Sequence, residues 1–309
     1  MTLWDGRWYV GLAKSGYNFD PAGLSNVAFL PLYPFLLRVF SFFTGSYQLS
    51  GLIVNFFSLV GAVFFLLKLT QKEGFTETQS KDSVFYMLIY PTAIFFAAVY
   101  TESLFIFLTI AVFYFCKQKE YFVAAVFGFF AAMTRVPGLF LLLPFFYYLY
   151  KQHVAWHKYL FAGLMPLGTS IYLLLQKIYT GNTFAFLTAQ RNWGRNFGHF
   201  NPDHVYWATS AGVANTILDI IFVAALLLGV IYIYKKLDFG YALFAILTIL
   251  VPLSTGSMLS IGRFGMILFP LAMGLAKSDN KWLKQGYVVV SLLLLAFYTI
   301  QFVNGYWAG

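Results

Sequence analysis

Charge is scarce in this sequence of 309 residues. Only 10% of the residues are Asp, Glu, Lys or Arg, whereas 60% are hydrophobic and 21% are aromatic. A soluble domain carries roughly 25% charged residues, so the composition excludes an ordinary soluble protein. Cysteine occurs once, at Cys116, which allows no internal disulfide and indicates no metal site. The glycines form no phosphate-binding turn of the kind that holds nucleotides.

The sequence is instead rich in apolar runs that carry few or no charges. Backbone polar groups must be satisfied inside a bilayer, and the period-two alternation of a membrane barrel is missing, so these runs predict helices. Several runs are shorter than the roughly 20 residues of an upright span, which favours short or tilted helices. We therefore predict an all-α polytopic membrane protein with about ten transmembrane helices. The runs are residues 51–67, 83–99, 104–116, 121–133, 136–150, 159–175, 211–234, 240–253, 264–276 and 286–303.

Lysine and arginine are segregated along the chain. Twelve of the fourteen lysines, and no arginine, lie in five connections that the positive-inside rule places in the cytoplasm. A guanidinium grips phosphate through a planar fork of donors, so the arginine-bearing external face is predicted to hold a site for an anion. The alternative is that these arginines contribute to topology alone. They are Arg7, Arg38, Arg135, Arg191, Arg195 and Arg263.

The apolar stretch 28–43 is a poor candidate for a continuous span. Pro31 and Pro34 interrupt the backbone ladder, and Arg38 would place a charge inside the bilayer. We therefore expect a re-entrant or interfacial helix at 28–45 and a first crossing at about 48–68. The predicted single domain, 1–309, comprises an external loop with this helix (1–47), core helices (48–178), a long external loop (179–207) and C-terminal helices (208–309).

Short motifs on the external segments carry a resemblance to a known family. They are WDGRWY (4–9), AFLPLYP (28–34), YTESLF (100–105) and TRVPG (134–138), with looser elements AQRNW (189–193) and GRF…FP (262–270). In these motifs the chain resembles the PIG-V-type mannosyltransferases, the family of the second mannosyltransferase of glycosylphosphatidylinositol assembly, which have the GT-C glycosyltransferase fold. Family members usually have a transmembrane helix before the WD pair. This sequence starts without it, so either the N-terminal segment is translocated unaided or a longer version of the chain carries that helix.

The resemblance implies a catalytic role for Asp5. In GT-C enzymes an acidic residue of the first external loop lies at the catalytic centre, where it would act as general base toward an acceptor hydroxyl. The implied reaction is an inverting transfer of a sugar, as in a mannosyltransferase, from a polyprenyl- or dolichyl-phosphate donor to a lipid or glycan acceptor. Candidates for binding the departing phosphate or the substrate are, in falling order for the arginines, Arg135, Arg263, Arg191 and Arg195, followed by Glu102, Arg7, Trp4 and Tyr33.

The implied partners are the lipid-linked donor, the acceptor and membrane lipids, with no nucleic acid and no cofactor. The site would face the exterior of a plasma membrane in a prokaryote, or the lumen of the endoplasmic reticulum in a eukaryote. The polar loop 179–207 is expected to recognise the acceptor and to close over the site.

Plainer interpretations of the same residues remain open. Asp5 could form a surface ion pair with Arg7, and Glu102 could pair structurally with Arg135. His199, His204 and Asp203 have the spacing of a loose metal site, but this ligand set is small and we expect no metal.

Two alternative functions also remain: a catalytically inactive GT-C scaffold that binds lipid, and a polytopic transporter of lipid or solute. A transporter would usually show broken helices in two repeated halves, and residues 1–150 and 151–309 show no such repeat.

Overall fold

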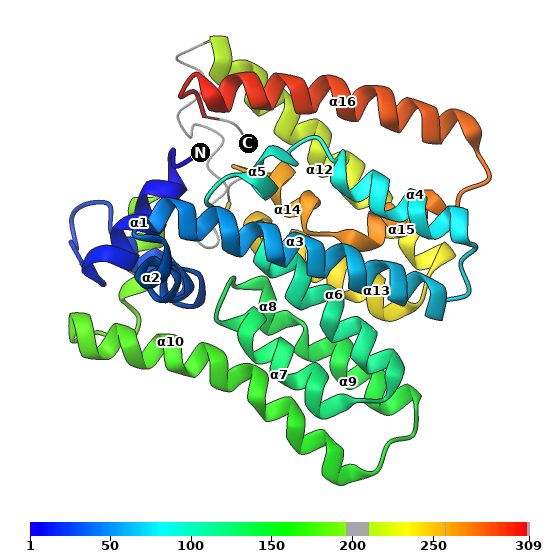
Figure 1. The fold of residues 1–309 in the computed structure, drawn as a ribbon, viewed down its shortest axis with the longest axis horizontal. Coiled ribbons are helices and arrows are strands. Elements are labelled where there is room, and N and C mark those ends of the chain that lie inside the picture. Colours follow the sequence, from blue (N-terminus) through cyan, green and yellow to red (C-terminus); the bar gives the residue numbers. More distant parts are fainter. Residues whose placement is uncertain (196–209, 257, 308–309) are drawn as a thin grey trace.

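The computed structural model describes residues 1–195, 210–256 and 258–307, and these residues form helices and connecting turns (Figure 1). The first elements are α1 (Asp5–Ser15), η1 (Asn26–Ala28), α2 (Leu32–Thr44), α3 (Tyr47–Lys72), α4 (Glu77–Leu88) and α5 (Ile94–Ala97). The middle elements are α6 (Glu102–Gln118), α7 (Tyr121–Ala132), α8 (Pro137–Phe140), α9 (Leu142–Lys151), η2 (Trp156–Gly163) and α10 (Leu164–Thr180). The last are α11 (Ala185–Asn192), α12 (Ser210–Lys236), α13 (Phe239–Ser254), α14 (Ile261–Met266), α15 (Phe269–Ala276) and α16 (Lys281–Val303).

Local sequence signals explain several helix ends. Thr76 and Gln79 form a reciprocal capping box at the start of α4, which satisfies two backbone N–H groups. The Asp238 side chain accepts a hydrogen bond from the backbone N–H of Gly240 at the start of α13. Gly45 and Gly181 adopt left-handed backbone conformations that end α2 and α10.

Four helical segments in the described part of the chain are long and apolar enough to cross a membrane. This finding supports a multi-pass integral membrane protein, but the expected count of about ten spans is not supported. Run 83–99 divides into the end of α4 and the short α5, and run 136–150 into α8 and α9. Proline cannot donate to the helical ladder, and Pro91 lies in the first of these breaks. The four segments are Tyr47–Lys72, Trp156–Thr180, Asn215–Lys236 and Lys281–Val303.

The region expected to hold a re-entrant or interfacial helix contains η1 and α2. The 13 residues of α2 rise about 20 Å, less than the roughly 30 Å hydrocarbon core of a bilayer. The expected first crossing at 48–68 falls within α3. The position of α2 relative to the membrane stays a prediction.

Helix α6 forms the centre of the bundle. It packs against α3 on one side and α7 on another, and α10 packs against the far side of α7 (Figure 1). The fully buried ring of Phe113 on α6 contacts aromatic rings from three other helices, Tyr148, Tyr241, Phe244 and Phe269. Edge-to-face and offset ring pairs of this kind stabilise the fold by more than the burial of their area alone. These contacts therefore hold the helices in place relative to one another.

An ion-pair network joins the C-terminal ends of α3, α6 and α9 to the start of α13. Lys117 lies 2.7 Å from Glu73 and 3.5 Å from Asp238, with its ammonium 4.8 Å from the centre of the Tyr148 ring. Lys151 also pairs with Asp238. Burial raises the pKa of the Asp238 carboxyl, but the hydrogen bond from Lys151 and the charge of Lys117 outweigh it and hold the pKa below its ordinary value.

Candidate active site

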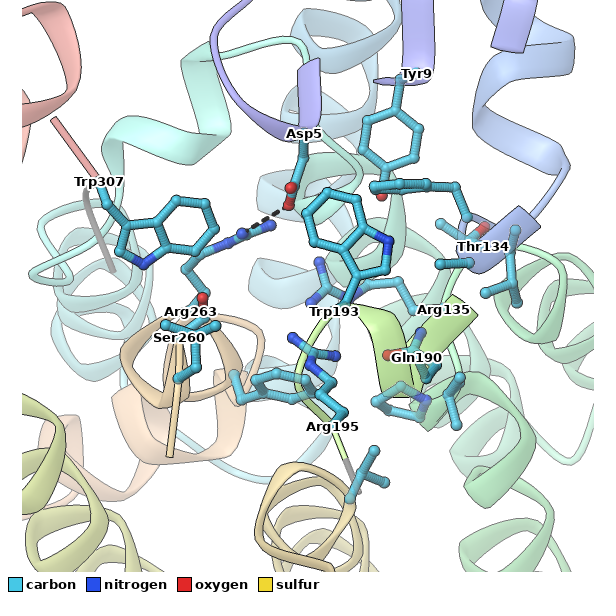
Figure 2. A pocket seen from close by; sticks show the side chains of 18 residues that line it. Asp5, Tyr9, Thr134, Arg135, Gln190, Trp193, Arg195, Ser260, Arg263 and Trp307 are labelled. Atoms are coloured by element: carbon cyan, nitrogen blue, oxygen red, sulfur yellow. Dashed lines mark hydrogen bonds and ion pairs between the residues drawn. The ribbon is translucent and has the colours of Figure 1, made fainter. Parts of the chain in front are cut away.

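A pocket of about 150 Å³ lies where several helix ends meet close to α1 (Figure 2). Asp5 reaches it from the first turn of α1, and Arg135 reaches it from the turn between α7 and α8. Arg263 comes from α14, and Arg195 follows α11. Aromatic side chains complete the walls, and they include Tyr9, Trp193 and Trp307. The sequence therefore contributes to this pocket from its first turn of helix to its last described residue.

Local backbone structure explains how the charged groups are presented. Asp5 is the first residue of α1, where the free N–H groups of the first helical turn favour a negative charge. Pro137 occupies the beginning of α8, a position that suits proline because no backbone N–H is required there. Arg135 consequently falls in the turn before this helix and is free to project into the pocket.

Glu102 connects two of the arginines from behind the pocket. Its Oε1 atom accepts hydrogen bonds from Nη1 of Arg135 at 2.7 Å and from Nη2 and Nε of Arg263 at 2.7 and 3.0 Å. Glu102 is completely buried at the start of α6 and does not line the pocket. A buried charge requires such partners, so Glu102 fixes the positions of both guanidinium groups. Arg135 also donates to the hydroxyl of Thr101 at 3.1 Å.

Arg263 is the link between this buried carboxylate and Asp5. Its Nη1 atom donates to Oδ2 of Asp5 at 2.8 Å, and its guanidinium lies over the rings of Phe95 and Tyr100 at 4.7 and 4.9 Å. The carboxylate contacts and the ring contacts both favour a charged guanidinium in a fixed position. Figure 2 shows the Asp5–Arg263 pair with the rings of Trp307 and Trp193 on either side.

Asp5 pairs with Arg263 and not with Arg7. Residues two apart on a helix point to nearly opposite sides, so Arg7 projects away from the pocket. The surface ion pair between Asp5 and Arg7 that the sequence allowed is therefore wrong. Among the residues that the structure describes, Asp5 is the one carboxylate that lines the pocket.

Arg195 is the third arginine of the pocket, and no described residue forms an ion pair with it. Burial lowers the pKa of its guanidinium, and the charges of Arg263 and Arg135 act in the same direction, whereas Asp5 opposes them. The group still stays protonated at neutral pH because an arginine pKa begins so high. Three guanidinium groups thus face two carboxylates, Asp5 and Glu102, which leaves a surplus of positive charge.

The structure does not bring every residue expected at the site into the pocket. Arg191 lies exposed in the last turn of α11, and Trp4 donates a hydrogen bond to the backbone oxygen of Tyr306 outside the pocket. Tyr33 is buried beneath Tyr9, with ring centres 5.2 Å apart. Their roles in substrate binding, and that of Arg7, stay predictions.

Several residues that line the pocket were not among the candidates expected from the sequence. Tyr9 is the last residue of the WDGRWY motif; its hydroxyl lies 3.4 Å from that of Thr101, and burial raises its pKa. Trp193 and Gln190 belong to the AQRNW element, so this motif is the sequence signal that points to them. Trp307 follows α16 and belongs to no motif, so only the folded chain reveals it.

No group of three or more His, Cys, Asp and Glu side chains in the described ranges is arranged to hold a metal ion. His199, Asp203 and His204, the loose set noted in the sequence, lie outside the residues that the structure describes.

Comparison with protein families gives a match for the N-terminal part of the chain. Residues 1–148 match the family model described as Mannosyltransferase (PIG-V). The match supports the PIG-V-type mannosyltransferase family, as the motifs predicted. It also supports a glycosyltransferase of the mannosyltransferase type. The matched segment contains Asp5, Glu102 and Arg135, whereas Arg195 and Arg263 lie beyond it. A search of curated proteins gave no match to the chain.

Proposed function

We propose that the chain transfers mannose, with inversion, from a polyprenyl-phosphate donor to a lipid or glycan acceptor at the external face of the membrane. One observation carries this proposal. Asp5, the lining carboxylate of the described pocket, is held by Arg263 at 2.8 Å beside two further arginines. Such a site combines a group that can take a proton with cations that can receive a phosphate.

Asp5 would act as general base in a single displacement. Its free oxygen accepts the proton of an acceptor hydroxyl while that oxygen forms a bond to the anomeric carbon of the donor sugar. The bond between the anomeric carbon and the phosphate oxygen breaks at the same time, and its electron pair leaves with the lipid phosphate. One displacement with one base inverts the anomeric configuration.

The leaving phosphate would be stabilised by the arginines of the pocket. Arg135 and Arg263 already share Glu102, so they supply fixed charge without having to reorganise. Arg195 lacks an ion-pair partner among the described residues and would make the direct contact with the phosphate. The rings of Trp193 and Trp307 would flank the sugar and exclude water.

A lipid-linked donor fits the rest of the chain. The chain is built from apolar helices and its glycines form no phosphate-binding turn, so a donor arriving through the bilayer suits it better than a soluble nucleotide sugar. The cytoplasmic lysine connections would place the pocket on the other face.

Transfer from a synthetic prenyl-phosphate mannose to a panel of acceptors in proteoliposomes tests the proposal. Wild type should transfer mannose, and Asp5→Asn should not, although it keeps its thermal unfolding profile and binds the donor. Asp20→Asn, which removes a carboxylate from the same external segment outside the pocket, is the matched control. Donor binding without transfer by wild type, across all acceptors, would favour the inactive scaffold instead.

A further inference from the structure

Three side chains from one short segment reach the active-site pocket together. Gln190 belongs to α11, and Trp193 and Arg195 follow this helix. All three line the pocket that contains Asp5, and Figure 2 shows them entering it from the same stretch of chain. This stretch, residues 190–195, is here called the α11 element. It presents an amide, an aromatic ring and a guanidinium to one ligand space, and it lies beyond the residues that match the family model.

The end of α11 explains why Gln190 and Arg195 lie next to each other. Gly194 has a φ of 78°, in the left-handed region that glycine adopts without strain. The chain therefore turns back, so that the backbone N–H of Gly194 donates to the oxygen of Arg191 at 2.8 Å and that of Arg195 donates to the oxygen of Gln190 at 2.9 Å. This pair of bonds is the Schellman motif, which places the residue after the glycine beside the last full turn of the helix.

Contacts with the segment before α2 hold the α11 element in place. The side chain of Asn192 donates to the backbone oxygens of Pro21 and Gly23 at 3.1 and 2.8 Å. The ring of Trp193 lies edge-on to that of Trp8, with ring centres 5.4 Å apart. The backbone that carries Gln190 is therefore fixed before a ligand arrives, which is the condition for selective recognition.

The side-chain amide of Gln190 has no hydrogen-bond partner within the described ranges. The hydroxyl of Thr134, which lines the same pocket, is engaged in contrast, because it donates to the backbone oxygen of Phe130 at 2.8 Å. An amide carries two N–H donors and an acceptor oxygen. These groups are available to a ligand in the pocket.

The chemistry of an amide indicates which part of a ligand it meets. The guanidinium groups of the pocket only donate, which suits phosphate oxygens, and the carboxylate of Asp5 only accepts. A sugar hydroxyl both donates and accepts, and Gln190 offers both functions. Because Arg195 lies beside Gln190, a phosphate held by this arginine would bring the hydroxyls of its own sugar to the amide.

We infer that Gln190 determines which sugar is transferred, because its amide hydrogen-bonds a hydroxyl of the donor hexose while Arg195 holds the phosphate on the same sugar. The α11 element thus recognises the donor, whereas the sequence led us to expect acceptor recognition by the loop 179–207. A site built to bond a hydroxyl discriminates against a sugar that lacks it, because the buried polar group then stays unpaired. The inference rests on the proposed function for the identity of the donor, but sugar recognition can be measured without any transfer.

The test compares equilibrium binding of prenyl-phosphate sugars to wild type and Gln190→Met in detergent. Methionine has about the length of glutamine but lacks the amide. The ligands are the mannosyl donor, its monodeoxy analogues, each of which lacks one sugar hydroxyl, and prenyl phosphate without sugar. Gln190→Met should weaken binding of the mannosyl donor about threefold to tenfold, the effect of a lost neutral hydrogen bond, and should leave prenyl phosphate unaffected.

The monodeoxy analogues identify the contact. Wild type should discriminate against at least one of them about as strongly as the substitution weakens binding of the mannosyl donor. Gln190→Met should bind that analogue and the mannosyl donor equally, because the same hydrogen bond is not lost twice. The remaining analogues should lose affinity by the same factor in both proteins.

Two control variants separate this pattern from a structural effect. Asn192→Ala removes the bonds that anchor α11 without changing a lining residue of the pocket. It should weaken binding of every ligand by a common factor, prenyl phosphate included, because it displaces Arg195 together with Gln190. Gln71→Met changes an exposed glutamine of α3 and should bind all ligands as wild type does. Thermal unfolding of each variant confirms that it is folded.

The outcomes separate the inference from the proposed function. A common loss for all ligands in Gln190→Met would show a structural role, and an equal loss for prenyl phosphate would show a phosphate contact; either result, or unchanged binding of the mannosyl donor, would overturn the inference. Transfer that depends on Asp5 would leave the proposed function standing in that case. The expected binding pattern without any mannose transfer would uphold sugar recognition by Gln190 and would overturn the proposed function alone.

Discussion

The guanidinium of Arg263 lies 2.8 Å from the carboxylate of Asp5, although 258 positions separate the two residues in the sequence. The same guanidinium bonds Glu102 through two other nitrogen atoms. One side chain from the C-terminal half therefore orients the proposed base of the N-terminal helix. Any transfer that depends on Asp5 should depend on Arg263 as well.

Replacement of Arg263 should abolish most activity and also reduce stability. In Arg263→Gln we expect kcat for mannose transfer to fall by about 10²–10³, the range for loss of a single preorganised donor. Arg263→Lys should recover little, because an ammonium cannot bridge two carboxylates as a planar fork does. Steady-state transfer in proteoliposomes and thermal unfolding measure the two effects. Arg38→Gln, at an exposed arginine of α2, is the control and should remain active.

Arg195 and Arg191 form a matched pair for the donor phosphate. Arg191 lies in the last turn of α11 and Arg195 follows this helix, but of the two only Arg195 lines the pocket. Arg195→Gln should raise the KM or Kd for the prenyl-phosphate donor by about tenfold or more, because a charge-assisted hydrogen bond is lost. Arg191→Gln should change it less than twofold. Equal effects of the two substitutions would contradict direct contact by Arg195 and would indicate a general electrostatic attraction.

Gly138 in the TRVPG element should not tolerate even a methyl group. A Cβ atom there would lie 2.2 Å from the backbone oxygen of Ala131, so α7 and α8 would have to move apart. We expect Gly138→Ala to destabilise the fold by about 1–3 kcal/mol, as overpacking does, and to lower the melting temperature. Gly163→Ala meets no atom within 4 Å and should be neutral or slightly stabilising. A melting temperature for Gly138→Ala equal to that of wild type would refute the close approach.

The Asp238 network predicts a pH-dependent contribution to stability. The folded-state pKa of Asp238 is lowered from its ordinary 3.8, so its contribution is present above that value and is lost as the pH falls through the folded pKa. Asp238→Asn keeps a helix-capping side chain but removes the charge. The melting temperature of wild type should exceed that of Asp238→Asn near neutral pH, and the two should converge below about pH 4. Glu77→Gln disrupts an exposed pair with Lys81 and should show no such difference.

Much of the fold and part of the site were accessible from the sequence. The scarcity of charge and the apolar runs predicted a helical membrane protein, and the described residues are helical. The motifs containing Asp5, Glu102 and Arg135 predicted the family, and the family match over residues 1–148 supports it. Helix counting was less successful, because apolar runs do not show where α4, α8 and α14 end. Composition measures whether a segment is apolar, whereas a helix end depends on backbone geometry set by its neighbours.

Local patterns in the sequence determined that this protein belongs in a membrane, because the cost of burying charge and unpaired backbone groups acts residue by residue. They also identified Asp5 and the arginines as chemically unusual in such a chain. Only the tertiary structure decided which arginine meets Asp5, that Glu102 lies behind the pocket, and that Arg7 faces the opposite side of α1. These relationships arise from packing between segments hundreds of positions apart, and no local pattern encodes the distance between two such side chains.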